Sequence, residues 1–167
     1  MADGVFGVEV VTPEQSLYAG GAHSVVLATS DGALTVLDGH TPLVGDVVPC
    51  ELKVEQAEGE LLRLAVHGGF LQVDTSPHAA EGLADEGDGP LPGLSTRVTV
   101  LAGIAELSEE IDVARAEQAR DAANQRVNEL QSGRGGEEVE VDLELAEAAG
   151  ALERAELRLA VAADNAA

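Results

Sequence analysis

The residues best suited to bind a charged ligand lie in the C-terminal third of the chain. Arg154 and Arg158 are four residues apart, so they share one face of a helix, where like charges cost about 0.2–0.5 kcal/mol. The chain carries a formal net charge of −22, so two stacked arginines indicate an anionic partner. That partner is either a phosphate group or the nearby carboxylates of Glu109, Glu110 and Glu156.

No constellation of side chains predicts catalysis or a metal site. Lys53 is the only lysine and follows Leu52 instead of a glycine-rich turn, which excludes a phosphate-binding P-loop. The histidines are scattered, without the spacing of metal ligands, at positions His23, His40, His67 and His78. No serine lies in a nucleophile-elbow context. We therefore expect a chain with no catalytic residues, no metal and no required cofactor.

Composition limits the possible partners and the compartment. The strong negative charge disfavours nucleic acid and adsorption to an anionic membrane surface, because both would repel the chain. The N-terminus lacks the features of a signal peptide, and no apolar stretch reaches the length of a membrane span. Cys50 is the only cysteine, which fits a reducing compartment. We expect a cytoplasmic protein with no direct membrane insertion.

The first half of the chain has the pattern of β structure. Its apolar segments are short, rich in β-branched residues and partly alternating. The predicted strands are Val8–Val11, Ser24–Leu27, Ala33–Leu37, Leu52–Glu55, Leu61–Val66, Phe70–Val73 and Arg97–Leu101. Turn residues separate them at Thr12-Pro13, Gly20-Gly21, Asp31-Gly32, Asp38-Gly39, Glu58-Gly59 and Gly68-Gly69. This spacing predicts an antiparallel β-sandwich over residues 1–104.

A segment of low periodicity lies between the last two predicted strands. Residues 76–95 contain several prolines, glycines and acids, and we expect them to form a flexible inserted loop. Its removal should leave the sandwich folded.

The period changes to that of helices over residues 105–167. Ser108 is a good N-cap residue, so we expect a first helix over about residues 109–131 and a second over about residues 142–163. A glycine-rich break at residues 132–136 separates them, which predicts an antiparallel hairpin. Asp112 and Arg115, three residues apart, would form a simple surface ion pair.

Several segments, in order along nearly the whole chain, resemble the epsilon subunits of bacterial rotary proton-translocating ATP synthases. They are Val10-Val11-Thr12-Pro13-Glu14-Gln15, Ser30-Asp31-Gly32-Ala33-Leu34, Gly39-His40-Thr41-Pro42-Leu43, Val66-His67-Gly68-Gly69-Phe70, Val98-Thr99-Val100-Leu101-Ala102 and Ile111-Asp112-Val113-Ala114-Arg115-Ala116. One of these segments alone would not identify a family, whereas the ordered set is specific for this one. The insertion at residues 76–95 departs from the family, which usually has a tight turn there.

The resemblance implies an N-terminal β-sandwich of about ten strands in two packed layers, followed by the helical hairpin. It implies a non-catalytic rotor subunit in the central stalk, whose sandwich binds the gamma subunit and the membrane c-ring. It also implies that the hairpin regulates hydrolysis of ATP by extending toward the alpha and beta subunits. The chain would then lie at the cytoplasmic face of the cell membrane as a peripheral part of the synthase.

The resemblance also implies two sets of site residues. The contact with the c-ring and gamma would involve Asp31, Gly32, Gly39, His40, Thr41 and Pro42. Regulatory ATP would contact Glu106, Ile111, Asp112, Arg115, Ala116, Arg154 and Arg158, with Asp112 on the adenine or ribose side and the arginines on the phosphates. Ala122 stands where relatives have a further arginine, which Arg120 or Arg126 would have to replace.

Two other functions are compatible with the same residues. The first is a stand-alone ATP-sensing module, without a motor. The second is a hydrolase that uses Asp or Glu, which the missing catalytic constellation disfavours. Co-purification with gamma and the c-ring separates the rotor subunit from the stand-alone module.

Overall fold

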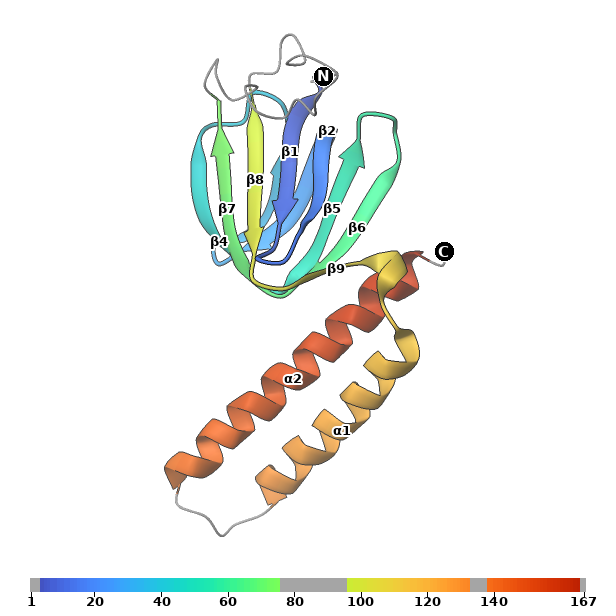
Figure 1. Cartoon of the computed structure of the whole chain (residues 1–167). Coiled ribbons are helices and arrows are strands. Elements are labelled where there is room, and N and C mark those ends of the chain that lie inside the picture. Colours follow the sequence, from blue (N-terminus) through green and yellow to red (C-terminus); the bar gives the residue numbers. More distant parts are fainter. Residues whose placement is uncertain (1–3, 76–95, 133–137, 166–167) are drawn as a thin grey trace. The chain divides into compact units, whose positions relative to one another are not determined.

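The computed structural model describes residues 4–75, 96–132 and 138–165. The chain divides into two compact units, Met1–Leu107 and Ser108–Ala167 (Figure 1). The boundary lies three residues later than the expected one after residue 104. Ala105–Leu107 form a short strand that pairs with Leu64–Val66, so these residues belong to the β unit.

The described part of the first unit contains nine strands, close to the number that the resemblance implied. Their bounds are β1 Phe6–Val11, β2 Ser16–Thr29, β3 Gly32–Val36, β4 Leu43–Val47, β5 Cys50–Gln56, β6 Leu61–Val66, β7 Gly69–Asp74, β8 Arg97–Ala102 and β9 Ala105–Leu107. All seven predicted strands are present, and β4 and β9 are additional. The inserted loop predicted at residues 76–95 lies outside the described residues.

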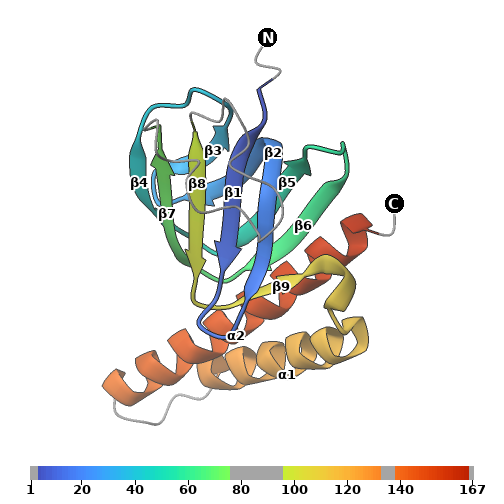
Figure 2. The same cartoon turned by 45° about the horizontal axis from the view of Figure 1, so that its top comes forward.

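The strands form a sandwich with one long strand shared by both layers. One layer runs β4-β7-β8-β1 and continues into the first half of β2; the other contains β3, the second half of β2, β5, β6 and β9. Figure 2 shows β3 beside β2. Pairing is antiparallel throughout the described sheet except between β1 and β8, which run parallel from Gly7↔Arg97 to Val11↔Leu101. The expectation of a purely antiparallel sandwich was therefore wrong for this pair.

The predicted turn at Gly20-Gly21 is wrong, because both glycines lie inside β2. They pair with Val8 and Gly7 of β1. A Cβ at Gly20 would lie 2.9 Å from the Tyr18 hydroxyl, and one at Gly21 would lie 2.8 Å from a Val5 methyl group. Here glycine provides space for neighbouring side chains instead of a turn.

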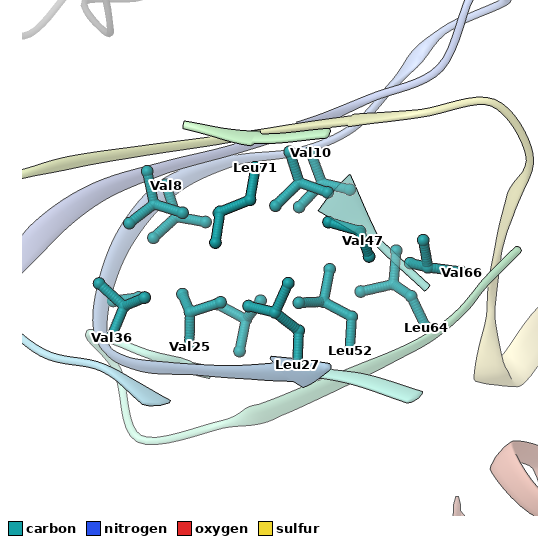
Figure 3. Close-up of a cluster of buried hydrophobic side chains, with 14 of the residues drawn as sticks. Val8, Val10, Val25, Leu27, Val36, Val47, Leu52, Leu64, Val66 and Leu71 are labelled. Carbon is teal, nitrogen blue, oxygen red and sulfur yellow. The ribbon is translucent and has the colours of Figure 1, made fainter. Parts of the chain in front are cut away.

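The core between the two layers is built from aliphatic side chains. Val8, Val10 and Leu71 from one layer face Val25 and Leu52 from the other (Figure 3). Phe6 is the one aromatic residue of the fully buried set. Closely packed Val and Leu side chains give a stiff body, because interiors at this density deform little.

Shortening Leu52 tests this core. Leu52 is fully buried, so Leu52→Ala should lower the free energy of unfolding by about 2–5 kcal/mol through lost burial and a cavity. The matched control is Leu61→Ala on the neighbouring strand β6, where the side chain is 50% exposed and the loss should stay below about 1 kcal/mol. Urea unfolding measures both; equal losses would contradict the placement of the core.

The second unit is a pair of helices after a short 3₁₀ turn. The turn covers Ser108–Glu110, α1 covers Val113–Ser132 and α2 covers Glu138–Asn165. The first helix therefore starts four residues later than expected, because residues 108–110 form the separate 3₁₀ turn. The second starts four residues earlier, since helix propagation adds residues at little cost even where Glu and Val alternate. Most of the predicted glycine-rich break lies outside the described residues.

Candidate functional site

The first turn of α1 is fixed by Asp112. Its Oδ1 accepts a hydrogen bond from the backbone N–H of Arg115 at 3.0 Å, and its carbonyl oxygen accepts one from Ala116 N–H at 2.9 Å. These two bonds are those of an N-cap residue. The expected ion pair between Asp112 and Arg115 is replaced by this backbone cap, and Ser108 is not the cap of α1.

The antiparallel register of the hairpin brings three arginines to one level. Arg126 of α1 forms an ion pair with Glu144 of α2, which fixes the register. Arg115 lies eleven residues before Arg126, and Ala155 lies eleven residues after Glu144, so these two positions lie at about the same height along the hairpin. Arg154 and Arg158 flank this position on α2 within one turn.

The buried positions agree with this register. Ala116 of α1 and Ala155 of α2 are both buried, as are Ala123 and Ala148 two turns away. Small side chains at these positions let the helices approach closely. Leu152, Leu159 and Ala162 continue the same face of α2 as Ala148 and Ala155, and they are half-buried.

The cations at this level differ in what surrounds them. Arg115 and Arg154 are exposed, and within the described chain neither guanidinium has a hydrogen bond or ion pair. The side chain of Arg154 runs back along α2 toward Gly150, because a Cβ placed at Gly150 would be 3.2 Å from the Arg154 Nη1. Arg158 is half-buried and takes part in an interaction within the chain.

The two arginines expected to replace a missing family arginine are engaged elsewhere. Arg120 binds Asp121 at 2.8 Å, and this hydrogen bond raises the pKa of Arg120. Arg126 binds Glu144 and also lies 3.6 Å from Glu129. Among the described arginines of the hairpin, this leaves Arg115 and Arg154 as the two whose guanidinium groups are available to an anion.

The other expected ATP contacts either belong to the first unit or are buried. Glu106 lies in β9 of the first unit, where its backbone pairs with Ala65, whereas the other six residues belong to the second unit. Ile111 is 9% exposed and Ala116 is 3% exposed, so both are apolar surface covered by the fold.

The expected contact residues of the sandwich lie at opposite ends of it. Asp31 and Gly32 form the exposed turn between β2 and β3, next to the β2–β4 pairing at Thr29↔Val47. The residues 39–42 follow the other end of β3, where Gly39 N–H donates to the Thr96 hydroxyl at 2.8 Å. The six residues therefore form two patches instead of one surface.

The loop at residues 39–42 is a well-braced connector. The ring of His40 lies with Nδ1 2.8 Å from the Thr41 carbonyl oxygen, and His40 N–H donates to the Leu37 carbonyl. Thr41 and Pro42 are exposed. These two contacts hold the loop in place and leave Thr41 and Pro42 accessible.

An apolar region on the outer face of the β4-β7-β8-β1 layer was not predicted. Phe70 pairs with Leu101, which pairs with Val11, so these three side chains share one face. Val44 lies on the same face, one pair along. Val44 is 73% exposed, Phe70 58% and Leu101 50%. We call these four residues the outer apolar face.

A groove of about 650 Å³ borders the outer apolar face. It is lined by Val11, Thr12, Pro13, His67, Gly68, Gly69, Phe70, Leu101, Ala102 and Gly103. The sequence signal was the alternation in Phe70–Val73 and Arg97–Leu101, which places Phe70 and Leu101 opposite the buried Leu71 and Val100. A large exposed apolar area next to a groove marks an interaction surface.

The remaining candidate groups have structural roles. Cys50 begins β5, and burial raises the pKa of its thiol, so it is a poor nucleophile. Its sulfur accepts a hydrogen bond from Ala28 N–H at 3.4 Å. Among residues 4–75, 96–132 and 138–165, no group of three metal-ligating side chains gathers. None of the described helices is long and apolar enough to cross a membrane.

Comparison with known proteins assigns both units. The family model of the ATP synthase delta/epsilon chain beta-sandwich domain matches residues 5–81, and that of the delta/epsilon chain long alpha-helix domain matches residues 109–163. The ATP synthase epsilon chain of Desulforudis audaxviator (strain MP104C) is 38% identical over 76% of this chain and 77% of its own length. The chain belongs to the ATP synthase epsilon-chain family. The epsilon chain of Thermobifida fusca (strain YX) is 37% identical over 70% of this chain and 72% of its own.

Solved structures agree with this family in fold. A chain of the Euglena gracilis mitochondrial ATP synthase, in the assembly of OSCP, F1 and c-ring, has a TM-score of 0.65 with 19% identity. The match covers 98% of this chain and 84% of that one. At this identity the likeness shows that the sandwich and the two helices are the family's fold.

Family membership decides the question of catalysis. An epsilon chain is a non-catalytic subunit of ATP synthase, and the relatives of this chain carry that name. The hydrolase alternative is therefore excluded, and the chain takes part in ATP synthesis and ion transport as a subunit of the complex.

Proposed function

We propose that this chain couples the gamma subunit to the c-ring in the central stalk and restrains ATP hydrolysis through its helical hairpin. It would do so as a peripheral subunit on the cytoplasmic face of the membrane. Family membership supports the place in the synthase, and the surface of the sandwich supports the coupling role.

The observation that carries the coupling role is the outer apolar face. Val44, Phe70 and Leu101 remain largely exposed in a chain whose formal net charge is −22. Exposed aromatic and aliphatic side chains in such an acidic protein cost solubility, so a partner that covers them stabilises the assembly. Gamma is the partner to which we assign this face.

The two separated patches fit a subunit held between two partners. Asp31-Gly32 and residues 39–42 lie at opposite ends of β3, so each patch can meet a different partner. A closely packed sandwich deforms little under load, so it can transmit a force from one end to the other. Contacts of one patch with gamma and of the other with the c-ring would use both.

The regulatory role rests on the separateness of the hairpin. It is a compact unit of its own, joined to the sandwich by the single connection after Leu107. Its buried positions are mostly alanines, which bury little area per residue. Such a unit can move as a whole toward the alpha and beta subunits without disturbing the core of the sandwich.

ATP sensing by the hairpin rests on its arginines. Arg115, Arg154 and Arg158 gather at one level, and two of them have free guanidinium groups within the described chain. Guanidinium groups bind phosphate oxygens strongly. We expect ATP to bind the hairpin only when it is not extended toward the alpha and beta subunits. An ATP concentration a hundred times the dissociation constant would then stabilise this non-extended form by about 2.7 kcal/mol and so oppose inhibition. Isothermal titration that showed no binding at millimolar ATP would remove this part of the proposal.

The docking face can be tested with two matched leucines. Leu101 and Leu61 are both 50% exposed on strands, but Leu61 lies in the other layer. We expect Leu101→Glu to weaken binding to isolated gamma by about tenfold or more, since it places a charge in an apolar contact. Leu61→Glu adds the same charge and should change binding by less than about threefold.

Both variants should unfold at temperatures close to that of the unchanged chain, because neither side chain is in the core. Surface plasmon resonance with immobilised gamma measures the affinities. Equal losses for the two variants would mean that gamma does not use the outer apolar face.

A further inference from the structure

In the described part of the sandwich, Thr96 is the one polar residue that is buried, at 1% exposure. Burying a hydroxyl group is unfavourable unless it forms a hydrogen bond. The Thr96 hydroxyl accepts the backbone N–H of Gly39 at 2.8 Å, and the Thr96 carbonyl oxygen accepts the N–H of Gly7 at 3.1 Å. Thr96 therefore ties the loop at residues 39–42 to the start of β8 and to the start of β1.

We propose that Thr96 is a positioning residue for the contact with gamma: through its hydroxyl it holds the loop at residues 39–42 in the conformation that gamma meets. The inference rests on the proposed coupling of gamma to the c-ring by the sandwich. It assigns one of the two separated patches to gamma, and it gives a function to a residue outside both sets of expected contacts.

The position of the loop decides which partner it meets. Pro42 lies two residues before Val44, which belongs to the outer apolar face that we assign to gamma. Two residues span at most about 7 Å, and Thr41, Pro42 and Val44 are all exposed. A partner that covers Val44 therefore reaches the loop as well. The patch at Asp31-Gly32, at the other end of β3, is left for the c-ring.

The conformation of Gly39 explains why the tie matters. Gly39 has φ of 78°, in the left-handed region, and glycine has the greatest conformational freedom of all residues. The bond to its N–H restrains a position where the chain would otherwise sample several conformations. The contacts of His40 with Leu37 and Thr41 lie within the connection itself. The bond from Thr96 joins this connection to a strand 57 positions away.

The burial of Thr96 excludes a direct contact between its side chain and a partner. Its effect on binding must pass through the loop, because the hydroxyl raises the fraction of molecules whose loop is ready to bind. The net contribution of one hydrogen bond corresponds to a change of about two- to tenfold in that fraction.

Valine and serine separate the hydroxyl from the rest of the side chain. Thr96→Val keeps nearly the same shape and loses the acceptor, whereas Thr96→Ser keeps the acceptor. With the full chain and immobilised gamma, surface plasmon resonance should show about two- to tenfold weaker binding for Thr96→Val, chiefly through slower association. Thr96→Ser should bind within about twofold of the unchanged chain.

Thr29→Val serves as the control at the other patch. The Thr29 hydroxyl donates to the Gly32 carbonyl at 3.1 Å, so this variant also loses a bond between a threonine and a backbone group. Its affinity for gamma should change by less than about twofold. A loss as large as that of Thr96→Val would overturn the specific role of Thr96.

Hydrogen exchange shows whether the tie itself is lost. The Gly39 amide should exchange faster in Thr96→Val than in the unchanged chain. The Gly7 amide bonds to the carbonyl of Thr96 and not to its side chain, so its exchange should stay the same. General unfolding would speed both amides, whereas release of the loop speeds only the first. Unchanged exchange at Gly39 would overturn the tie.

The outcomes separate this inference from the proposed function. If Thr96→Val bound gamma as tightly as the unchanged chain while its Gly39 amide exchanged faster, the positioning role would be wrong and the coupling role would stand. Equal losses for Thr96→Ser and Thr96→Val would overturn the role of the hydroxyl. If the unchanged chain did not bind gamma, the proposed coupling would be wrong, and the positioning of the loop for gamma would be wrong with it.

Discussion

Replacing Gly69 by alanine should destabilise the sandwich more than any other single change at a glycine of the sheet. Gly69 has φ of 154°, and a Cβ there would overlap the Leu101 carbonyl oxygen and lie 2.9 Å from the Ala102 Cα. Both contacts are with the backbone of β8, which cannot move aside as a side chain can. We expect Gly69→Ala to lower the free energy of unfolding by about 3 kcal/mol or more.

Gly103→Ala is the matched control for this prediction. Gly103 lies in the same groove, but a Cβ there would meet nothing within 4 Å. Its substitution should change the free energy of unfolding by less than about 1 kcal/mol. Urea unfolding of both variants decides, and a stable Gly69→Ala would show that β7 and β8 are farther apart than described.

Removing residues 108–167 should release ATP hydrolysis by the assembled synthase. The cut after Leu107 keeps β9 and its pairing with β6, so the remaining sandwich should fold and still bind the stalk. If the hairpin holds most complexes in an inhibited state, its loss should raise the hydrolysis rate by about two- to tenfold. Steady-state ATPase assays on complexes reconstituted with either form measure this.

A second truncation controls for the fold. Cutting after Ile104 removes β9 as well, exposes the edge of β6 and should lower the thermal unfolding temperature of the sandwich. Equal hydrolysis rates with the full chain and with residues 1–107 would contradict the regulatory role, provided that both forms are present in the complex.

The sequence predicted the strands that alternate and missed those that do not. Val8–Val11 and Arg97–Leu101 have clear β patterns, and both are strands of the structure. β4 was missed because Gly45 and Asp46 lower its strand propensity, and β9 because three residues carry too little pattern. Periodicity also does not encode the direction of a partner, so the parallel pairing of β1 with β8 could not be predicted.

The candidate sites show a similar division. The spacing of Arg154 and Arg158 predicted a shared helix face, but only the hairpin register brings Arg115 to their level. Asp112 before Val113 was a readable cap signal, and Ser108 before an acidic run competed with it. The outer apolar face depends on pairing between Phe70 and Leu101, which are 31 positions apart, and no local pattern reveals such a contact.

Co-purification tests the central claim most directly. The chain, tagged at its C-terminus, would be isolated from its own cells after mild detergent extraction, and bound subunits would be identified by mass spectrometry. We predict that gamma and the c subunit are recovered with the unchanged chain and with Leu61→Glu, and that gamma is depleted with Leu101→Glu. Recovery of the folded chain without any synthase subunit would contradict its role in the central stalk.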